Sequence, residues 1–279
     1  MEKLIDLHTH STASDGSLSP EELVAHAAES GLSAVAVSDH DNTDGIRPAM
    51  REGQKVGIEV VPAIELSAKS DTETHILGYF IDPDSLEMKN AMKHIREVRV
   101  ERISETCELL EKYNIHVTLD EVKKKAGSGI LCRAHIAKIM TEKGYVSSPR
   151  EAFARWMNVG CPAYSDAQAI TDEESIELIT KAGGDAYLAH LHLTKKNGDE
   201  LDSFVKRLKN AGLCGIEGYY TDYTPDMERE YRTLAEKYEL KISGGTDFHG
   251  AFKPHISIGR GVGNLEIPYS VLEKMREGR

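Results

Sequence analysis

Short apolar runs that each lead to an ionisable side chain constrain the fold of this chain more than any other feature. Residues 34–38 and 186–189 are continuous and apolar, as strands buried on both faces are. Helical patterns separate most of these runs, and this alternation predicts an α/β barrel. In such folds the carboxyl ends of the strands carry the functional site. We therefore expect the chemistry of this chain at one end of a barrel.

The first apolar run, residues 4–7, leads into His8 and His10, which stand two positions apart. Side chains at i and i+2 of a strand point to the same face, so both imidazoles are expected to reach one cation. Asp15 follows on a Ser/Gly turn that can bend its carboxylate back to the same point. Imidazole and carboxylate are normal ligands of zinc, manganese or iron. A surface strand that carries two histidines by chance is the alternative.

Further ionisable residues lie at the ends of nearly every predicted strand, whereas a chance distribution would also scatter them over helix faces. Six imidazoles and three carboxylates are more ligands than one ion needs. They suit two or three metal ions, with a carboxylate bridging a pair. The predicted ligands are His8, His10, Asp15, His40, Glu65, His75, His190, Asp247 and His249.

Composition limits the possible partners. The formal net charge is −12, which argues against a broad cationic surface for long duplex nucleic acid. Bound metal ions would still permit a short anionic substrate. The four cysteines form no C-x-x-C pair, which predicts reduced thiols in a cytoplasmic protein. The sequence shows no signal peptide and no long apolar run, so we expect no membrane association, and nothing indicates an obligate protein partner.

The sequence changes in character after the run that begins with His75. Charged helical patterns with Gly-rich breaks occur there without a convincing buried strand. We interpret residues 97–165 as a helical insertion domain, a lid over the C-terminal face of the barrel. Residues 1–96 and 166–279 then form the barrel domain.

These motifs, in this order, resemble the PHP family, the polymerase and histidinol phosphatase family of metal-dependent phosphoesterases. The resemblance covers essentially the whole chain outside the insertion and implies a distorted (β/α)7 barrel with a trinuclear site. The motifs that carry it are His8-Thr-His10, Ser38-Asp-His40-Asp, Glu65, His75, Ala189-His190 and Gly245-Thr-Asp247-Phe-His249.

The resemblance also implies how the ligands are shared among two or three divalent ions of manganese, zinc or iron. Glu65 would be shared by the first and second ions, and Asp15 and His249 would lie near the third, beside the reacting groups. The implied sets are His8, His10, Glu65 and Asp247; Glu65, His75 and His190; and Asp15, His40 and His249.

Two departures from the family pattern bear on the substrate. Asp15 stands where histidinol phosphatases usually carry a histidine, and Leu191 stands where the family often has proline. The insertion, with the stretch Cys132-Arg133-Ala-His135, most resembles the subgroup that acts on nucleotides. Those enzymes remove a phosphate from nucleoside 3′,5′-bisphosphates, and relatives trim short RNA from its 5′ end.

We therefore expect an enzyme that hydrolyses a phosphate ester of a small nucleotide by attack of a metal-bound hydroxide. Arg133, His135 and Lys253 are candidate substrate-binding residues, with a solvated or structural role as the alternative for each. Glu217 and Tyr219 are candidates for orienting ligand histidines, with simple packing as the alternative for Tyr219. The alternative functions are a 5′–3′ exonuclease on short RNA or DNA, a histidinol-phosphate-type phosphatase, a metal-dependent hydrolase of C–N bonds and a non-catalytic metal-binding module.

Overall fold

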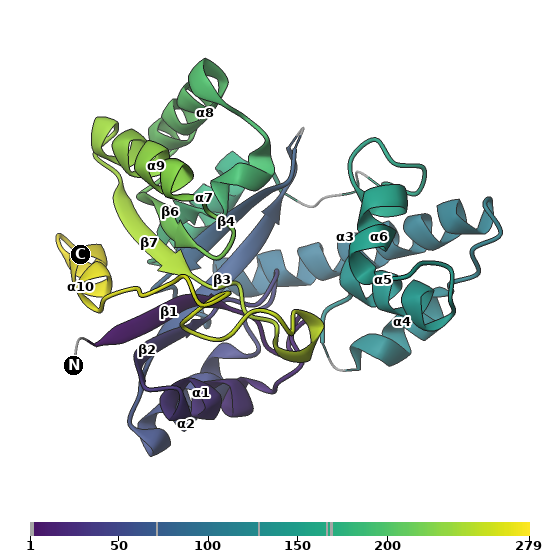
Figure 1. The fold of residues 1–279 in the computed structure, drawn as a ribbon, viewed down its shortest axis with the longest axis horizontal. Coiled ribbons are helices and arrows are strands. Elements are labelled where there is room, and N and C mark those ends of the chain that lie inside the picture. Colours follow the sequence, from purple (N-terminus) through teal and green to yellow (C-terminus); the bar gives the residue numbers. More distant parts are fainter. Residues whose placement is uncertain (1–2, 71, 128, 166, 168–169) are drawn as a thin grey trace.

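The computed structural model describes residues 3–70, 72–127, 129–165, 167 and 170–279. Its centre is a sheet of seven strands whose spatial order follows the chain (Figure 1). The first and last strands meet at one end, where the His10 amide donates to the Phe248 carbonyl and the Asp247 amide donates to the His8 carbonyl. The sheet is thus a nearly closed barrel, and the predicted distorted α/β barrel is confirmed.

One strand of the barrel runs in the opposite direction to its neighbours. β4 pairs antiparallel with both β3 and β5, whereas the other neighbouring strands are parallel. The start of β4 therefore lies beside the carboxyl ends of the other strands. The strands are β1 (Leu4–Thr9), β2 (Leu32–Val37), β3 (Glu59–Ala68), β4 (Thr74–Tyr79), β5 (Asp185–Leu188), β6 (Gly215–Tyr220) and β7 (Lys241–Gly245).

Helices cover the outside of the barrel and one of its ends. Val271 and Leu272 of α10 pack with Ile5, Leu7 and Tyr79 in one buried apolar cluster, so apolar side chains fill the barrel on the side of α10. The opposite end is left for polar side chains. The helices around the barrel are α1 (Pro20–Glu29), α2 (Ile46–Val56), α7 (Asp172–Lys181), α8 (Gly198–Asn210), α9 (Pro225–Lys237) and α10 (Ser270–Arg276).

Helix α3 (Leu86–Glu111) links the barrel to a group of helices that stands beside it (Figure 1). Met88 and Ile95 in its first half belong to an apolar cluster of the barrel and its helices. Ile103 and Leu110 in its second half belong to a separate cluster. The other members of the group are α4 (Leu119–Ala126), α5 (Arg133–Glu142), α6 (Pro149–Ala152) and a π-helical turn (Phe153–Met157).

We call the described residues of 97–165 the helical block. It contacts the loop that follows β1, where the Ile130 amide donates to the Ala13 carbonyl at 3.0 Å. Arg99 of α3 donates to the Leu131 carbonyl at 3.0 Å and forms an ion pair with Asp41, which follows β2. The block is therefore fixed to the end of the barrel where the polar residues lie. Its boundaries as a domain stay a prediction.

Strands β1 and β7 approach each other so closely that Gly245 has no room for a side chain. A Cβ atom at this position would lie 2.2 Å from the Cβ of His8, well inside van der Waals contact. The missing side chain lets the strands meet and brings Asp247 beside the histidines of β1. Among the described helices, none has the length and hydrophobicity that a membrane span requires.

Candidate metal centre

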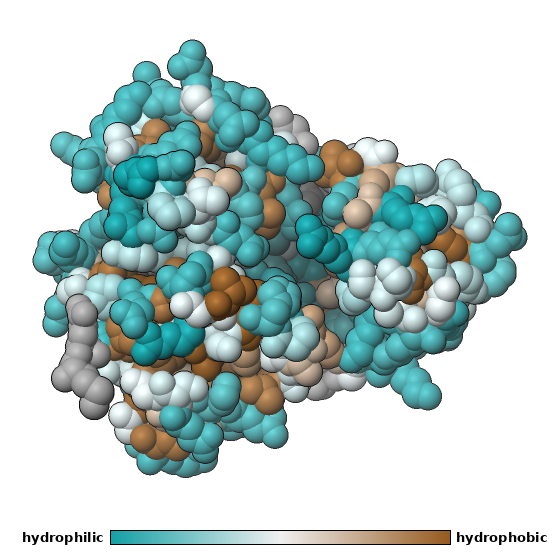
Figure 2. Space-filling view, in the orientation of Figure 1, coloured by the Kyte–Doolittle hydropathy of each residue, from teal (hydrophilic) through white to brown (hydrophobic). Residues whose placement is uncertain are grey.

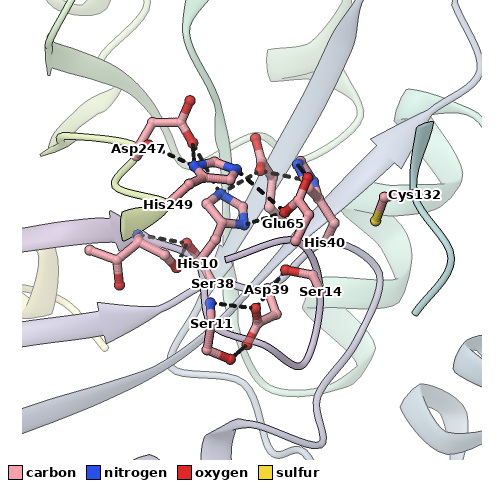
Figure 3. Close-up of polar contacts among 12 residues, drawn as sticks. His10, Ser11, Ser14, Ser38, Asp39, His40, Glu65, Cys132, Asp247 and His249 are labelled. Carbon is pink, nitrogen blue, oxygen red and sulfur yellow. Dashed lines mark hydrogen bonds and ion pairs between the residues drawn. The ribbon is translucent and has the colours of Figure 1, made fainter. Parts of the chain in front are cut away.

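The structure brings the nine predicted ligand residues together at the polar end of the barrel. Each has a ligand atom within 4.0 Å of a ligand atom of another member. Figure 3 shows His10 between Asp247 and His249 on one side and Glu65 and His40 on the other. His75 reaches the cluster from the start of β4 because that strand is reversed.

Glu65 lies at the centre of the cluster. Its Oε2 atom lies 3.0–3.3 Å from imidazole nitrogens of three histidines, and its Oε1 atom lies 2.9–3.0 Å from nitrogens of two more. One carboxylate that faces two groups of imidazoles has the geometry of a bridge between two cations. The first group is His8, His10 and His40, and the second is His75 and His190.

One set of ligand atoms has the spacing of a tetrahedral site. Asp247 Oδ1 lies 3.6 Å from His8 Nε2 and 3.1 Å from His10 Nε2, and both nitrogens lie 3.3 Å from Glu65 Oε2. Ligand bonds of about 2.1 Å in a tetrahedron place neighbouring ligand atoms about 3.4 Å apart. Both nitrogens and Glu65 Oε2 are buried without a hydrogen-bond partner in the described part of the chain. Buried polar atoms of this kind fit a divalent cation.

A second set surrounds Asp15. Its Oδ1 atom lies 3.3 Å from His249 Nε2 and 3.8 Å from His10 Nδ1, and its Oδ2 atom lies 4.0 Å from His40 Nε2. Ligand atoms of these four residues lie within 4.8 Å of one another. His40 also turns its Nδ1 atom to Glu65, 3.0 Å away. The two sets therefore share residues, as in a centre with several neighbouring ions.

Electrostatics favour positive charge at this centre. Burial raises the pKa of Glu65, but the neighbouring imidazoles of His40 and His8 outweigh it and the pKa lies well below its ordinary value. Burial lowers the pKa of His10, yet the neighbouring carboxylates of Asp247 and Glu65 raise it to about 9. The carboxylates thus stay ionised and stabilise cations beside them, whether protons on imidazoles or metal ions.

Asp39 fixes the loop that carries Asp15. Its Oδ1 atom accepts from the Ser11 amide at 2.8 Å and from the Ser14 hydroxyl at 2.6 Å, and its Oδ2 atom accepts from the Ser11 hydroxyl at 2.6 Å (Figure 3). These bonds hold the loop on both sides of its bend, so Asp15 is presented to the histidines by a rigid support.

Glu217 orients two histidines of the cluster. Its Oε1 atom lies 2.9 Å from His8 Nδ1, and its Oε2 atom accepts from the His190 amide at 2.7 Å. A proton on His8 Nδ1 leaves a free lone pair on Nε2, the nitrogen that faces Glu65, so Nε2 can bind a metal ion. The predicted contact between Glu217 and a histidine of the cluster is present.

We expect Glu217→Gln to lower the affinity for metal by about 10- to 100-fold, because a neutral amide no longer fixes and polarises the His8 ring. A chelator-competition titration of the purified protein measures this affinity. Glu236→Gln, an exposed change on α9, is the matched control and should leave the affinity unchanged. Equal affinities for the two variants would contradict an orienting role for Glu217.

Tyr220 and Lys253 orient Asp247. The Tyr220 hydroxyl donates to Asp247 Oδ2 at 2.9 Å, and Lys253 Nζ donates to the same oxygen at 2.5 Å. Oδ1 is thereby turned to the histidines. Tyr219, a candidate from the sequence for orienting a histidine, instead packs with its ring under the Arg232 guanidinium group. A bulge between Glu217 and Tyr219 shifts the alternation of β6, so that Tyr220 is the tyrosine that points to the cluster.

A cavity of about 420 Å³ lies between the cluster and the helical block. The space-filling view in Figure 2 shows a hollow at this junction. Carboxylate and imidazole groups line it on the barrel side, and guanidinium groups line it on the block side. These residues are Asp15, His40 and His75, and Arg99, Arg102 and Arg133.

The three predicted substrate-binding residues lie in different surroundings. Arg133 lines the cavity and donates to the Met157 carbonyl at 2.9 Å. His135 is buried, and its Nδ1 atom accepts from the Cys132 amide at 3.1 Å at the start of α5. Among the described residues, neither His135 nor Lys253 lines the cavity. Substrate contacts of all three stay predictions.

Comparison with known proteins shows that this protein is a metal-dependent phosphoesterase. More particularly, the PHP domain model matches residues 6–253, and the chain belongs to the PHP family. The expected membership and enzyme class are confirmed. The cytoplasmic location stays a prediction.

Curated relatives cover most of the chain. A 5′–3′ exoribonuclease from Escherichia coli is 32% identical over 92% of this chain and 88% of its own length. A 3′,5′-nucleoside bisphosphate phosphatase from Chromobacterium violaceum is 30% identical over 94% of this chain and 91% of its own. A phosphoribosyl 1,2-cyclic phosphate 1,2-diphosphodiesterase from Eggerthella lenta is 28% identical over 90% of this chain and 97% of its own length.

Solved structures share the fold. A protein from Chromobacterium violaceum described as an amidohydrolase with bound sulfate superposes with a TM-score of 0.88 at 28% identity, over 97% of this chain and 96% of its own. A protein from Bifidobacterium adolescentis described as a metal-dependent phosphoesterase superposes with a TM-score of 0.86 at 26% identity, over 98% of this chain and 95% of its own.

Proposed function

We propose that this enzyme hydrolyses a phosphate ester of a small nucleotide, such as a nucleoside 3′,5′-bisphosphate. The observation that carries the proposal is the cavity that joins the ligand cluster to three arginines. A substrate with anionic groups at both ends would find cations at both ends of this space. The bisphosphate phosphatase among the relatives supports this substrate class, and the sulfate in the structural neighbour supports anion binding.

We also propose that the cluster holds two or three divalent ions of manganese, zinc or iron, with Glu65 as a bridging ligand. The orphaned nitrogens of His8 and His10 and the spacing of the ligand atoms support this assignment. When bound, such ions supply a nucleophile from water at neutral pH and stabilise the charge on the reacting phosphate. The proposed sets are His8, His10, Glu65 and Asp247; Glu65, His75 and His190; and Asp15, His40 and His249.

Some residues around the cluster orient the ligand side chains, and others line the cavity in which the substrate would bind. Glu217, Tyr220 and Lys253 hold the ligand side chains in place. Asp15, His40 and His75 line the cavity, so the two ligand sets that contain them would face the reacting ester. Phe153 forms part of the apolar wall on the block side of the cavity.

A second candidate function is 5′–3′ exonuclease activity on short RNA. The exoribonucleases from Escherichia coli and from Haemophilus influenzae, 32% and 34% identical to this chain, favour it. The cavity of about 420 Å³ is within the range of small-ligand pockets, which favours a single nucleotide as the bound unit. We therefore place the bisphosphate first and the oligonucleotide second.

A phosphate-release screen tests the proposal. The purified enzyme, supplied with manganese, zinc or iron in turn, is given nucleoside monophosphates, nucleoside 3′,5′-bisphosphates and a short 5′-phosphorylated RNA. We expect the highest kcat/KM with a bisphosphate. Shortening of the RNA without phosphate release from bisphosphates would favour the second candidate, and no cleavage of any phosphate ester would overturn both.

A further inference from the structure

Asp6 is a buried carboxylate that the proposed metal chemistry does not use. It stands on β1 two residues before His8, and none of its surface is exposed. Its Oδ1 atom accepts from the amides of His8 at 3.3 Å and Thr246 at 2.9 Å. Its Oδ2 atom accepts from the Thr246 hydroxyl at 2.6 Å and the Gly259 amide at 2.8 Å. Burial of a carboxylate is costly unless donors satisfy it, so these donors are what keep Asp6 inside the fold.

The carboxylate of Asp6 completes the junction between the first and last strands of the barrel. Beside the first half of β1 lies the segment that leads to α10, where the Ile5 amide donates to the Ile267 carbonyl at 2.9 Å. Beside the end of β1 lies the chain that follows β7. Between these two points the Thr246 amide donates to a side-chain oxygen of Asp6, where a regular pair of strands would supply a backbone carbonyl.

Asp247, the residue after Thr246, has a backbone conformation that needs support. Its φ angle is 56°, in the left-handed region that residues other than glycine seldom adopt. Such a conformation persists only where the surrounding structure fixes it. The two hydrogen bonds that Thr246 donates to Asp6 fix the preceding residue. They thereby help to hold Asp247 Oδ1 at 3.6 Å from His8 Nε2 and 3.1 Å from His10 Nε2.

The same carboxylate acts on His8 through the backbone. The pairing of β1 with β2 shifts register between Asp6 and Thr9, and the His8 amide lies within this shift. That amide donates to Asp6 Oδ1, so the carboxylate supports the irregular part of the strand. Two proposed ligands of the first set, His8 and Asp247, are therefore held through contacts with one side chain.

We infer that Asp6 is a positioning residue of the metal centre. Together with Thr246 it sets the distance between the ligand atoms of His8 and Asp247, and so the affinity for the ion that they bind. This inference rests on the proposed metal centre and goes beyond it, because Asp6 is not itself a ligand. An asparagine in its place would point amide N–H groups at the backbone N–H of Thr246 or of Gly259, whichever way it is turned, so only a carboxylate satisfies every donor.

Metal binding by Asp6→Asn, Thr246→Val and Thr246→Ser tests the inference. Each purified protein is freed of metal and given cobalt(II). Chelator competition then measures the affinity, and the visible absorption spectrum reports the arrangement of ligands around the cobalt. We expect Asp6→Asn to lower the affinity by about 100-fold and Thr246→Val by about 10-fold, both with an altered spectrum. Thr246→Ser keeps the hydroxyl and should stay within about threefold of the wild type.

Steady-state kinetics separate a positioning role from substrate binding. With the best phosphate ester of the screen, at saturating metal, we expect Asp6→Asn to lower kcat by about 10-fold or more and to change KM by less than about threefold. Asp226→Asn and Thr233→Val, exposed changes on α9, are the matched controls and should leave the affinity, the spectrum and the rates unchanged. A rise in KM with wild-type kcat and cobalt affinity would overturn the inference.

Thermal melting of each variant shows whether it is folded. Folded variants with a lower melting temperature, but with the cobalt affinity and spectrum of the wild type, would show a structural role alone and overturn the inference while the metal centre stands. If Asp6→Asn does not fold, Thr246→Val and Thr246→Ser decide, and equal affinities of these two variants overturn the inference. The cobalt measurements need no turnover, so they decide even if the proposed substrate is wrong. A wild type that binds no cobalt overturns the metal centre and the inference with it.

Discussion

Glu65→Gln is expected to abolish phosphate release, with kcat/KM lowered by about 1,000-fold. The carboxylate faces five imidazoles through its two oxygens, and an amide of the same size removes the negative charge and replaces one oxygen with a donor. Both predicted bridging contacts are lost together. Steady-state kinetics with the best substrate of the screen, at saturating metal, measure the effect.

Elemental analysis of the same samples shows whether the loss follows the metal. We expect Glu65→Gln to retain less metal after gel filtration than the wild type. Glu230→Gln, an exposed change on α9, provides the control and should keep both activity and metal content. A Glu65→Gln enzyme with activity within tenfold of wild type would show that no bridge at Glu65 is needed.

Removal of divalent cations with a chelator is expected to abolish activity and to lower the melting temperature by about 5 °C. A ligand at about 100 times its Kd contributes about 2.7 kcal/mol to stability, and 1 kcal/mol shifts the melting temperature of a protein of this size by about 2 °C or more. The orphaned ligand atoms of His8, His10 and Glu65 are the reason to expect that the folded state binds the ions.

Differential scanning calorimetry and phosphate release, before and after chelation, give the two readouts. Adding manganese, zinc and iron back one at a time identifies the ion that restores both. A protein that elemental analysis shows to be free of metal, and that still releases phosphate at its original rate, would refute the proposed role of the ions.

The order of strand-end residues made the site predictable from sequence, because the barrel brings the ends of distant strands together. His75 reaches the site for a different reason. It begins its strand, and only the reversal of β4 carries it to the right end of the barrel. The short stretch of residues 69–73 between β3 and β4 was the available signal, since a parallel connection needs a dozen or more residues.

Other parts of the site left little trace in the sequence. The bulge in β6 points Tyr220, rather than Tyr219, to the cluster. It depends on the pairing of β6 with β7, which the sequence of one strand does not reveal. Arg102 stands among many charged residues of α3, where helical periodicity predicts a solvent-exposed face. Its burial depends on how the helical block packs against the barrel, a tertiary property that no local pattern encodes.

The continuity of α3 has a mechanical consequence. One uninterrupted helix of 26 residues starts in the apolar cluster of the barrel and ends in that of the block. Movement of the helical block relative to the barrel would require α3 to bend. The distance between Arg102 and the polar end of the barrel is therefore set by the geometry of a continuous helix. A single inserted residue ahead of Arg99 would rotate everything after it by about 100° and turn both guanidinium groups out of register.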